Sequence, residues 1–358
     1  MIHLASPIIG DEEIDAVTRV MRSGMLAQGK EVAAFEDEFA AEFDAGHAAA
    51  ISNGTMALVV ALQAVGVKSG DEVIVPSFTF AATANAVALV GATPVFADID
   101  AATFCIEPSH VATLVTDRTR AIIPVHLYGH MAPMRRLRAI ADKHGLRIIE
   151  DAAQAHGARR DGLPVGALAD LSTYSFYPTK NMTTGEGGMI TGRDSELVER
   201  VKLLRNHGME KRYHHDLIGG NARMTEMGAA IGRIQLRNVS GWNKRRREIA
   251  GEYDQRLDTI VATPSVADDT EHVYHQYTIR SERRDDLIAA FAEAGIGYGI
   301  YYPIPCHRQE AFRRFADPEE LVETDRAAAE VLSIPIRPDL TTREVEYVID
   351  AIKKGAKQ

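Results

Sequence analysis

Short apolar runs alternate with amphipathic segments from about residue 50 onward, and this alternation limits the fold more than any other feature of the chain. Strand-like runs occupy 71–76, 94–99, 120–129 and 146–154, and helical patterns occupy 55–67, 80–92 and 132–145. Strands that are apolar on both faces and separated by helices are typical of a parallel sheet covered on both sides. The pattern therefore predicts a large α/β domain.

The pattern changes near residue 240. A charged helix from Trp242 to about Leu257, a strand-like run at 273–280 and helices at 285–295 and 342–354 follow without the earlier alternation. A chain of 358 residues is long enough for one large domain and one smaller one. We therefore expect a large α/β domain over 1–240, with its N-terminal segment, and a smaller α+β domain over 241–358.

Composition limits the classes of partner. The net charge of −10 argues against binding to nucleic acid or to an anionic membrane surface. No stretch approaches the roughly 20 apolar residues that span a bilayer, and the N-terminus lacks the pattern of a signal peptide. Two distant cysteines, Cys105 and Cys306, indicate neither a disulfide framework nor a metal knuckle. We expect a cytoplasmic protein without a bound metal.

Three polar clusters follow predicted strands or open predicted helices. They are SNGT at 52–55, EDAAQAHG at 150–157 and SFYPTK at 175–180. In open α/β sheets, ligands bind outside the carboxyl ends of the strands. The common position of the clusters at this edge favours one shared ligand.

The cluster SNGT stands at the start of a helix that Asn53 can cap. The amides of Gly54 and Thr55 then lie where a helix N-terminus presents unpaired N–H groups, which favours a phosphate, and glycine permits close approach. An ordinary helix cap without a ligand explains the same residues. The cluster alone does not separate the two interpretations.

Glu150 and Asp151 come directly after an apolar strand. A carboxylate there can hold a protonated ring nitrogen through a charge-assisted hydrogen bond. Gln154, three residues later, can donate to a phenolic oxygen on the same ring. The alternative is an acidic strand end that caps a neighbouring helix.

Lys180 lies between a proline bend and a glycine-rich turn. It could be an exposed surface charge, but burial would lower the pKa of its amine and make it nucleophilic toward an aldehyde. A phosphate cradle, a ring carboxylate and such an amine are together the parts that hold pyridoxal 5′-phosphate as a Schiff base. We therefore interpret Lys180 as the Schiff-base lysine.

Segments that occur in a fixed order resemble the DegT/DnrJ/EryC1/StrS family of pyridoxal-phosphate-dependent sugar aminotransferases. They are SNGTMAL, PSFTFAATANA, PVHLYGH, EDAAQAHGA, SFYPTKNMTTGEGG, GGNARMTEMGAAIGRIQL and YYPIPCH. The resemblance runs from the N-terminal region to 332–340, nearly the whole chain. It implies a fold like that of aspartate aminotransferase (fold type I), with a large mixed, mainly parallel sheet. It also implies a homodimer with active sites at the subunit interface.

The resemblance also assigns roles to residues. It implies that Lys180 forms the Schiff base, that Asp151 pairs with the pyridine nitrogen and that Gln154 contacts the ring oxygen. The remaining cofactor-binding assignments are a phosphate site, an aromatic ring that stacks on the cofactor and a residue that reaches the neighbouring subunit. These are Gly54, Thr55 and Ser175 for the phosphate, Phe80 for stacking and Asn221 for the neighbouring subunit.

Two positions depart from the family pattern in the part of the chain associated with substrate binding. In YYPIPCH, Tyr301 stands where many members have histidine, and in SIPIRPDL, Arg337 stands where histidine is usual. Arg337 could offer a fork to a phosphate or carboxylate, or be a surface replacement. His307 could line the pocket or be structural. We predict Tyr301, His307 and Arg337 as the residues that contact the substrate.

The resulting hypothesis is an aminotransferase in which Lys180 also acts as the general base. The donor is expected to be glutamate or glutamine, and the acceptor a keto-sugar, most simply a nucleotide-linked keto-deoxysugar. Arg223 and the basic run 244–247 are candidates for contacts with such an anionic substrate, although that run also reads as a solvated helix face.

Three rival functions remain open. A cyclitol or cyclic keto acid could replace the sugar as the acceptor, and the sequence does not separate these substrates. A pyridoxal-phosphate-dependent sugar dehydratase in this family carries histidine at the position of Lys180. A non-catalytic regulator would not need the complete set of Lys180, Asp151 and Gln154.

Overall fold

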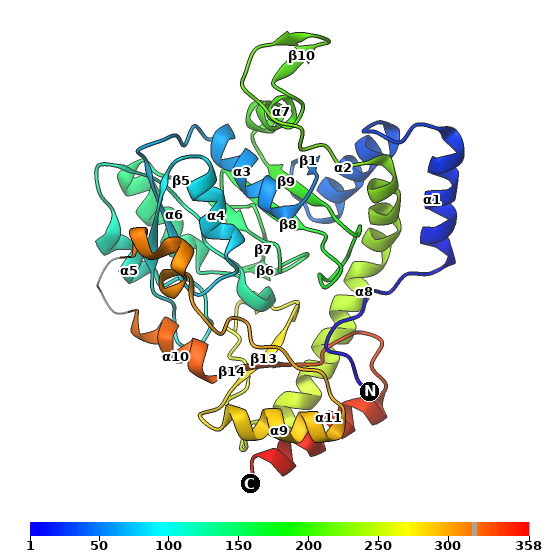
Figure 1. The fold of residues 1–358 in the computed structure, drawn as a ribbon, viewed down its shortest axis with the longest axis vertical. Helices are drawn as coiled ribbons and strands as arrows, with labels where there is room; N and C mark the ends of the chain where they lie inside the picture. Colours follow the sequence, from blue (N-terminus) through cyan, green and yellow to red (C-terminus); the bar gives the residue numbers. More distant parts are fainter. Residues whose placement is uncertain (317–320, 358) are drawn as a thin grey trace.

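A seven-stranded sheet forms the centre of the larger part of the molecule (Figure 1). The structure, a computed structural model, describes residues 1–316 and 321–357. In spatial order the strands are β1 (His47–Ile51), β9 (Gly188–Gly192), β8 (Leu171–Ser175), β5 (Arg147–Asp151), β4 (Thr119–Ile122), β2 (Glu72–Pro76) and β3 (Thr93–Ala97).

Most neighbouring strands in this sheet are parallel. β2 pairs in parallel with β3 and β4, β4 with β5, and β5 with β8, whereas β9 is antiparallel to both β1 and β8. The predicted mixed, mainly parallel sheet is therefore confirmed. Because β9 alone reverses direction, β1 again ends at the same edge as the parallel strands.

Both faces of the sheet are buried, as the apolar runs predicted. Alternate side chains of a strand enter different clusters: Ile148 packs in one and Ile149 in the other. The helices of this part of the chain are α1 (Asp11–Ser23), α2 (Lys30–Glu42), α3 (Gly54–Ala64), α4 (Ala82–Leu89), α5 (Pro108–Leu114), α6 (Met134–His144) and α7 (Ser195–Leu204). None of the helices within the described residues is long and apolar enough to cross a membrane.

The long helix α8 (Glu226–Leu257) connects the two parts of the molecule (Figure 1). Its first half packs against α1 and α2, and its second half joins an apolar cluster with α9 (Arg284–Ala294) and α11 (Thr342–Gly355). The same cluster includes the antiparallel pair β13 (Tyr277–Arg280) and β14 (Val331–Ile334). Because α8 runs unbroken through residue 240, a domain division at that residue stays a prediction.

Shorter elements complete the fold. The hairpin of β10 and β11 projects from the body of the molecule beyond α7 (Figure 1). The shorter elements are η1 (Leu127–Gly129), β6 (Arg159–Arg160), β7 (Leu163–Pro164), β10 (Met209–Lys211), β11 (His214–His215), β12 (Thr270–Glu271), η2 (Cys306–Arg308), η3 (Glu310–Phe315) and α10 (Val322–Glu330).

Two predicted strands are shorter in the structure. The run 120–129 is a strand only as far as Ile122, and the run 273–280 begins its strand at Tyr277. In both cases the apolar pattern continues into segments that are buried without sheet pairing. The basic run 244–247 also differs from a solvated face, since Arg246 is buried and donates to the carbonyls of Tyr274 and Ile336.

Candidate active site

A cavity of about 880 Å³ opens at the carboxyl edge of the central sheet. Its size suits a cofactor-sized ligand. The lining comes from the turns after β1, β2, β4, β5 and β8, from segment 273–276 and from the tyrosine pair before η2. The polar and aromatic lining residues include Asn53, Gly54, Thr55, Thr79, Phe80, Asp151, Gln154, Ser175, Tyr177, Lys180, Glu186, His275, Gln276, Tyr301 and Tyr302.

One wall of the cavity is the N-terminus of α3. Asn53 caps the helix, and its Oδ1 accepts from the amide of Met56 at 2.9 Å. The amides of Gly54 and Thr55 precede the helical hydrogen bonds and border the cavity. A Cβ added to Gly54 would lie 2.8 Å from the Cβ of Ser175, so only glycine allows this amide to lie against the serine hydroxyl. The arrangement suits a phosphate.

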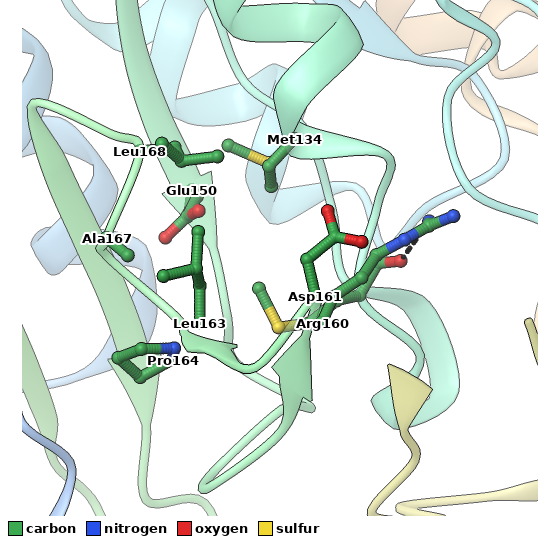
Figure 2. A pocket seen from close by; sticks show the side chains of 9 residues that line it. Met134, Glu150, Arg160, Asp161, Leu163, Pro164, Ala167 and Leu168 are labelled. Carbon is green, nitrogen blue, oxygen red and sulfur yellow. Dashed lines mark hydrogen bonds between the residues drawn. The ribbon is translucent and has the colours of Figure 1, made fainter. Parts of the chain in front are cut away.

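The two acidic residues at the end of β5 point to opposite faces of the sheet. Glu150 faces a small cavity of about 10 Å³ on the other side (Figure 2). Its Oε2 accepts from the amide of Gly166 and the hydroxyl of Ser172, each at 2.6 Å. Asp151 alone borders the large cavity. The alternation of side chains along a strand therefore separates a structural carboxylate from one that a ligand can reach.

The carboxylate of Asp151 is held by two donors. The hydroxyl of Thr83 donates to its Oδ2 at 2.8 Å, and the amide of Ala153 donates to its Oδ1 at 3.2 Å. Burial raises the pKa of Asp151, whereas these hydrogen bonds and the charge of Lys180 act in the opposite direction. A cationic group in the cavity would therefore favour the ionised carboxylate.

Gln154 is oriented by contacts at both ends of its side-chain amide. Its Oε1 accepts from the backbone amide of Tyr128 at 2.6 Å, and its Nε2 donates to the hydroxyl of Tyr302 at 3.2 Å. A backbone N–H can only donate, so it identifies the oxygen and leaves the amide nitrogen toward the cavity. Gln154 thus presents a donor, as expected for a contact with a ring oxygen.

Lys180 lies in the turn after β8, and its backbone amide donates to the carbonyl of Tyr177 at 2.9 Å. Burial lowers the pKa of Lys180 to about 8, and the negative charge of Asp151 partly offsets this effect. A substantial fraction of the amine is therefore unprotonated near neutral pH, as nucleophilic attack on an aldehyde requires.

Aromatic side chains form the outer wall. Phe80 is 60% exposed and lies with its ring centre 6.0 Å from that of Tyr302. Tyr301 also lines the cavity, as predicted for a substrate-facing residue, and its backbone carbonyl accepts from the hydroxyl of Tyr128. The exposed face of Phe80 is available for stacking on a flat ring.

Three predicted site residues are not among those that line the cavity. His307 is buried; its ring Nδ1 lies 2.7 Å from the hydroxyl of Ser77, which anchors its segment to the end of β2. Arg337 donates to Asp339 and to the carbonyl of His3. Asn221 is exposed on the surface, in the segment after the β10–β11 hairpin.

The structure adds residues that the sequence analysis did not select. Thr83, Tyr302 and His275 contact the predicted site or line the cavity. Thr83 is one helical turn after Thr79 in a small-residue helix, a weak signal, and Tyr302 adjoins the selected Tyr301. His275 was assigned to a strand, which hid its position in the wall.

The residues present fit pyridoxal phosphate. The helix N-terminus and Ser175 provide donors for a phosphate, Asp151 an acceptor for a ring N–H, and Gln154 a donor for a ring oxygen. The amine of Lys180 borders the same cavity. Five separate turns of the chain thus supply complementary groups for one flat, anionic aldehyde.

Comparisons with known proteins agree with this chemistry. Residues 7–353 match the DegT/DnrJ/EryC1/StrS aminotransferase family. The chain is 43% identical over 347 residues to dTDP-3-amino-3,4,6-trideoxy-alpha-D-glucose transaminase of Streptomyces venezuelae, covering 96% of this chain and 92% of that protein. It is 45% identical over 347 residues to a Geobacillus stearothermophilus protein named "Pleiotropic regulatory protein", covering 95% and 93%.

The likeness extends to three dimensions. The crystal structure of S. venezuelae DesV in complex with a ketimine intermediate superposes with a TM-score of 0.95 at 43% sequence identity. The match covers 97% of this chain and 95% of that one. The predicted fold class and cofactor are thereby confirmed. The chain belongs to the DegT/DnrJ/EryC1/StrS aminotransferase family, and it is an aminotransferase that uses pyridoxal phosphate.

Proposed function

We propose that this aminotransferase moves an amino group from glutamate or glutamine to a keto-sugar that is linked to a nucleotide. The observation that carries the proposal is the convergence of Lys180, Asp151 and Gln154 on one cavity beside the α3 N-terminus. The similarity to the S. venezuelae sugar-nucleotide transaminase supports the class of acceptor.

Bound pyridoxal phosphate supplies an aldehyde that takes up an amino group and a ring that accepts electrons. Lys180 binds this aldehyde, and its freed amine then takes the proton from the α-carbon of the amino donor. Asp151 accepts the hydrogen bond of the ring N–H and keeps that nitrogen protonated. The amide of Gln154 donates to the ring oxygen.

The remaining predicted contacts orient the ring. The amides of Gly54 and Thr55 and the hydroxyl of Ser175 bind the phosphate at the helix N-terminus. Phe80 stacks on the outer ring face and excludes water from the reacting atoms. Tyr301, in the wall near Phe80, contacts the acceptor sugar.

The charge balance of the cavity favours a shared active site. Of the lining residues in the described part of the chain, Lys180 is the sole lysine or arginine, whereas Asp151 and Glu186 are acidic. Glutamate and a nucleotide-linked sugar both carry negative charge that needs cationic partners. A second subunit is therefore the proposed source of the missing positive charge.

A homodimer provides that second subunit. Asn221 would reach the phosphate site of the neighbouring subunit, and the projecting β10–β11 hairpin carries the exposed cations Lys211 and Arg212. Tyr213 in the hairpin and Ile218 after it are 76% and 96% exposed, which is consistent with burial against another chain.

Absorbance spectroscopy tests the donor half of the reaction. Purified protein is mixed with pyridoxal phosphate and then with L-glutamate or L-glutamine, and wild type is compared with Lys180→Ala. We expect a bound-cofactor band that one donor converts to the pyridoxamine form, and a Lys180→Ala variant that lacks the wild-type band. A band unchanged by both donors would contradict the assigned donors and favour the dehydratase or regulator.

The acceptor is tested next with keto-sugars linked to dTDP or UDP, each compared with a cyclic keto acid and a keto-cyclitol. Return of the pyridoxal band identifies a competent acceptor. Faster return with the cyclic keto acid or the cyclitol would overturn the proposed sugar substrate while leaving the aminotransferase intact.

Subunit complementation tests the shared site. Lys180→Ala and Asn221→Ala proteins are mixed, unfolded and refolded together. If Asn221 serves the neighbouring subunit, each mixed dimer contains one site with both residues intact, and activity rises above that of either variant. If Asn221 serves its own subunit, every site lacks one residue and no activity is recovered.

A further inference from the structure

A chain of buried side-chain amides lies behind Lys180. Asn181, the next residue, donates through its Nδ2 to the carbonyl of Val273 at 3.0 Å and to Oδ1 of Asn243 at 2.7 Å. Asn243, on α8, donates through its own Nδ2 to the carbonyl of His156 at 2.8 Å. Both asparagines are at least 96% buried, so these contacts are shielded from water.

The backbone carbonyls determine how both amides are oriented. A carbonyl oxygen only accepts, so the Val273 and His156 carbonyls each require an N–H and identify the nitrogen of the asparagine that faces them. The remaining oxygen of Asn181 then lies 3.2 Å from Nδ1 of His275. Because this oxygen also only accepts, Nδ1 of His275 carries the proton.

The second nitrogen of His275 follows from the first. In a neutral imidazole one nitrogen donates and the other accepts, so Nε2 carries a lone pair. The ring of His275 lines the large cavity, and Nε2 has no hydrogen-bond partner among the described residues. The ring therefore offers an acceptor to a group in the cavity.

We infer that Asn181 is a positioning residue that locks His275 in the Nδ1-protonated tautomer, so that Nε2 of His275 accepts a hydrogen bond from the amine of Lys180. The tautomer is independent of the enzyme's activity; its use to hold the freed amine during proton transfer rests on the proposed function. The arrangement gives a desolvated amine a fixed acceptor while its lone pair stays directed at the substrate.

The surroundings keep the imidazole neutral. Burial lowers the pKa of His275 well below its ordinary value, and the charges of Lys180 and Arg246 and a contribution from His156 act in the same direction. Burial and the charge of Lys180 also lower the pKa of His156, to about 3. A neutral His275 can accept from an ammonium or an amine, whereas a protonated one would repel the ammonium.

Solid-state NMR of protein labelled with ring-¹⁵N histidine tests the tautomer directly, without cofactor or substrate. The His275 signals are those absent from His275→Gln. We expect a protonated Nδ1 and an unprotonated Nε2 at pH 7 in the wild type and in the control Asn238→Ala, an exposed asparagine on the same helix α8. Asn181→Ala should redistribute the proton between the two nitrogens. A proton on Nε2 in the wild type, or an unchanged tautomer in Asn181→Ala, would overturn the proposal.

The contact with Lys180 is tested by reductive methylation of the cofactor-free protein with formaldehyde and cyanoborohydride, followed by peptide mass spectrometry. An acceptor stabilises the ammonium more than the amine, so its loss in His275→Leu should lower the midpoint of the pH profile for Lys180 by about one unit. His275→Gln, which keeps an acceptor oxygen, should restore most of the shift.

A double-mutant cycle separates positioning from general destabilisation. If Asn181 acts through His275, Asn181→Ala lowers the midpoint of Lys180 labelling in the wild-type background and has no further effect in His275→Leu. Equal shifts in both backgrounds, or none in His275→Leu itself, would contradict the proposal. These measurements need neither cofactor binding nor turnover, so they stand apart from failure of the proposed function.

Discussion

The hydroxyl of Thr83 donates a hydrogen bond to Oδ2 of Asp151 over 2.8 Å, and the hydroxyl of Thr79 lies 3.1 Å from that of Thr83. A small-residue helix, α4, thus supports the carboxylate proposed to pair with the cofactor ring. Such a bond to a charged group stabilises it by about 2 kcal/mol.

Thr83→Val should therefore weaken pyridoxal phosphate binding by roughly 30-fold, because an unsupported Asp151 carboxylate holds its charge less well. Thr83→Ser keeps the hydroxyl and should bind within about threefold of wild type, given that proportionality. Absorbance titration at pH 7.5 measures both affinities. Equal losses in the two variants would show that the methyl packing, and not the hydrogen bond, matters.

Asp151 should make the cofactor-free protein less stable as the pH rises. Its pKa is raised by burial, so the folded state binds the proton more tightly than the unfolded state. Stability present when the carboxyl is protonated is lost as the pH rises from the unfolded-state pKa through the folded-state pKa. Asp151→Asn should remove this loss.

Urea denaturation at pH 4, 5, 6 and 7 measures that effect. The free energy of unfolding of Asp151→Asn relative to wild type should increase steadily over this range. Asp37→Asn, at an exposed position on α2, is the matched control and should show no such trend. A relative stability that stays flat or falls with pH would refute the expectation.

The amine of Lys180 should titrate near pH 8. Its pKa is lowered by burial and raised by Asp151, so the amine is protonated below about pH 8 and reactive above it. Methylation of the cofactor-free wild type should show this midpoint, and Asp151→Asn should move it lower because the stabilising negative charge is gone. Lys244, an exposed lysine in the same protein, is an internal reference. A Lys180 midpoint equal to that of Lys244 would contradict the shift.

Glu226 should be important for stability, although it lies outside the cavity. Its buried carboxylate accepts from the amides of Gly29, Glu31 and Val32, and so caps α2 from the start of α8. Glu226→Ala leaves buried donors without partners and should cost about 2–4 kcal/mol of unfolding free energy. Glu226→Gln keeps one acceptor oxygen and should cost about half as much.

Urea denaturation distinguishes these variants, with Glu346→Ala as the control at an exposed site. The control should change the unfolding free energy by less than about 0.5 kcal/mol. A Glu226→Ala protein as stable as this control would show that water replaces the carboxylate at the helix terminus.

The sequence determined the type of sheet and the parts of the chemistry because both depend on local patterns. Apolar runs such as 71–76 must be buried wherever they lie, and helix signals such as Asn53 and Gly145 act on neighbouring residues; both end or cap helices where predicted. The motif around Lys180 and that around Asp151 likewise named the cofactor, because so few residue types supply a nucleophilic amine and a ring carboxylate.

Only the tertiary structure decided which residues share the cavity. Strand alternation sends Glu150 away from the cavity and Asp151 into it, a choice that depends on the register of β5. Contacts such as Thr83 with Asp151, separated by 68 residues, and Asn181 with Asn243, separated by 62, arise from packing between distant elements. A local pattern carries no information about such distances, so His275 read as a strand residue although buried polar contacts hold it in the cavity wall.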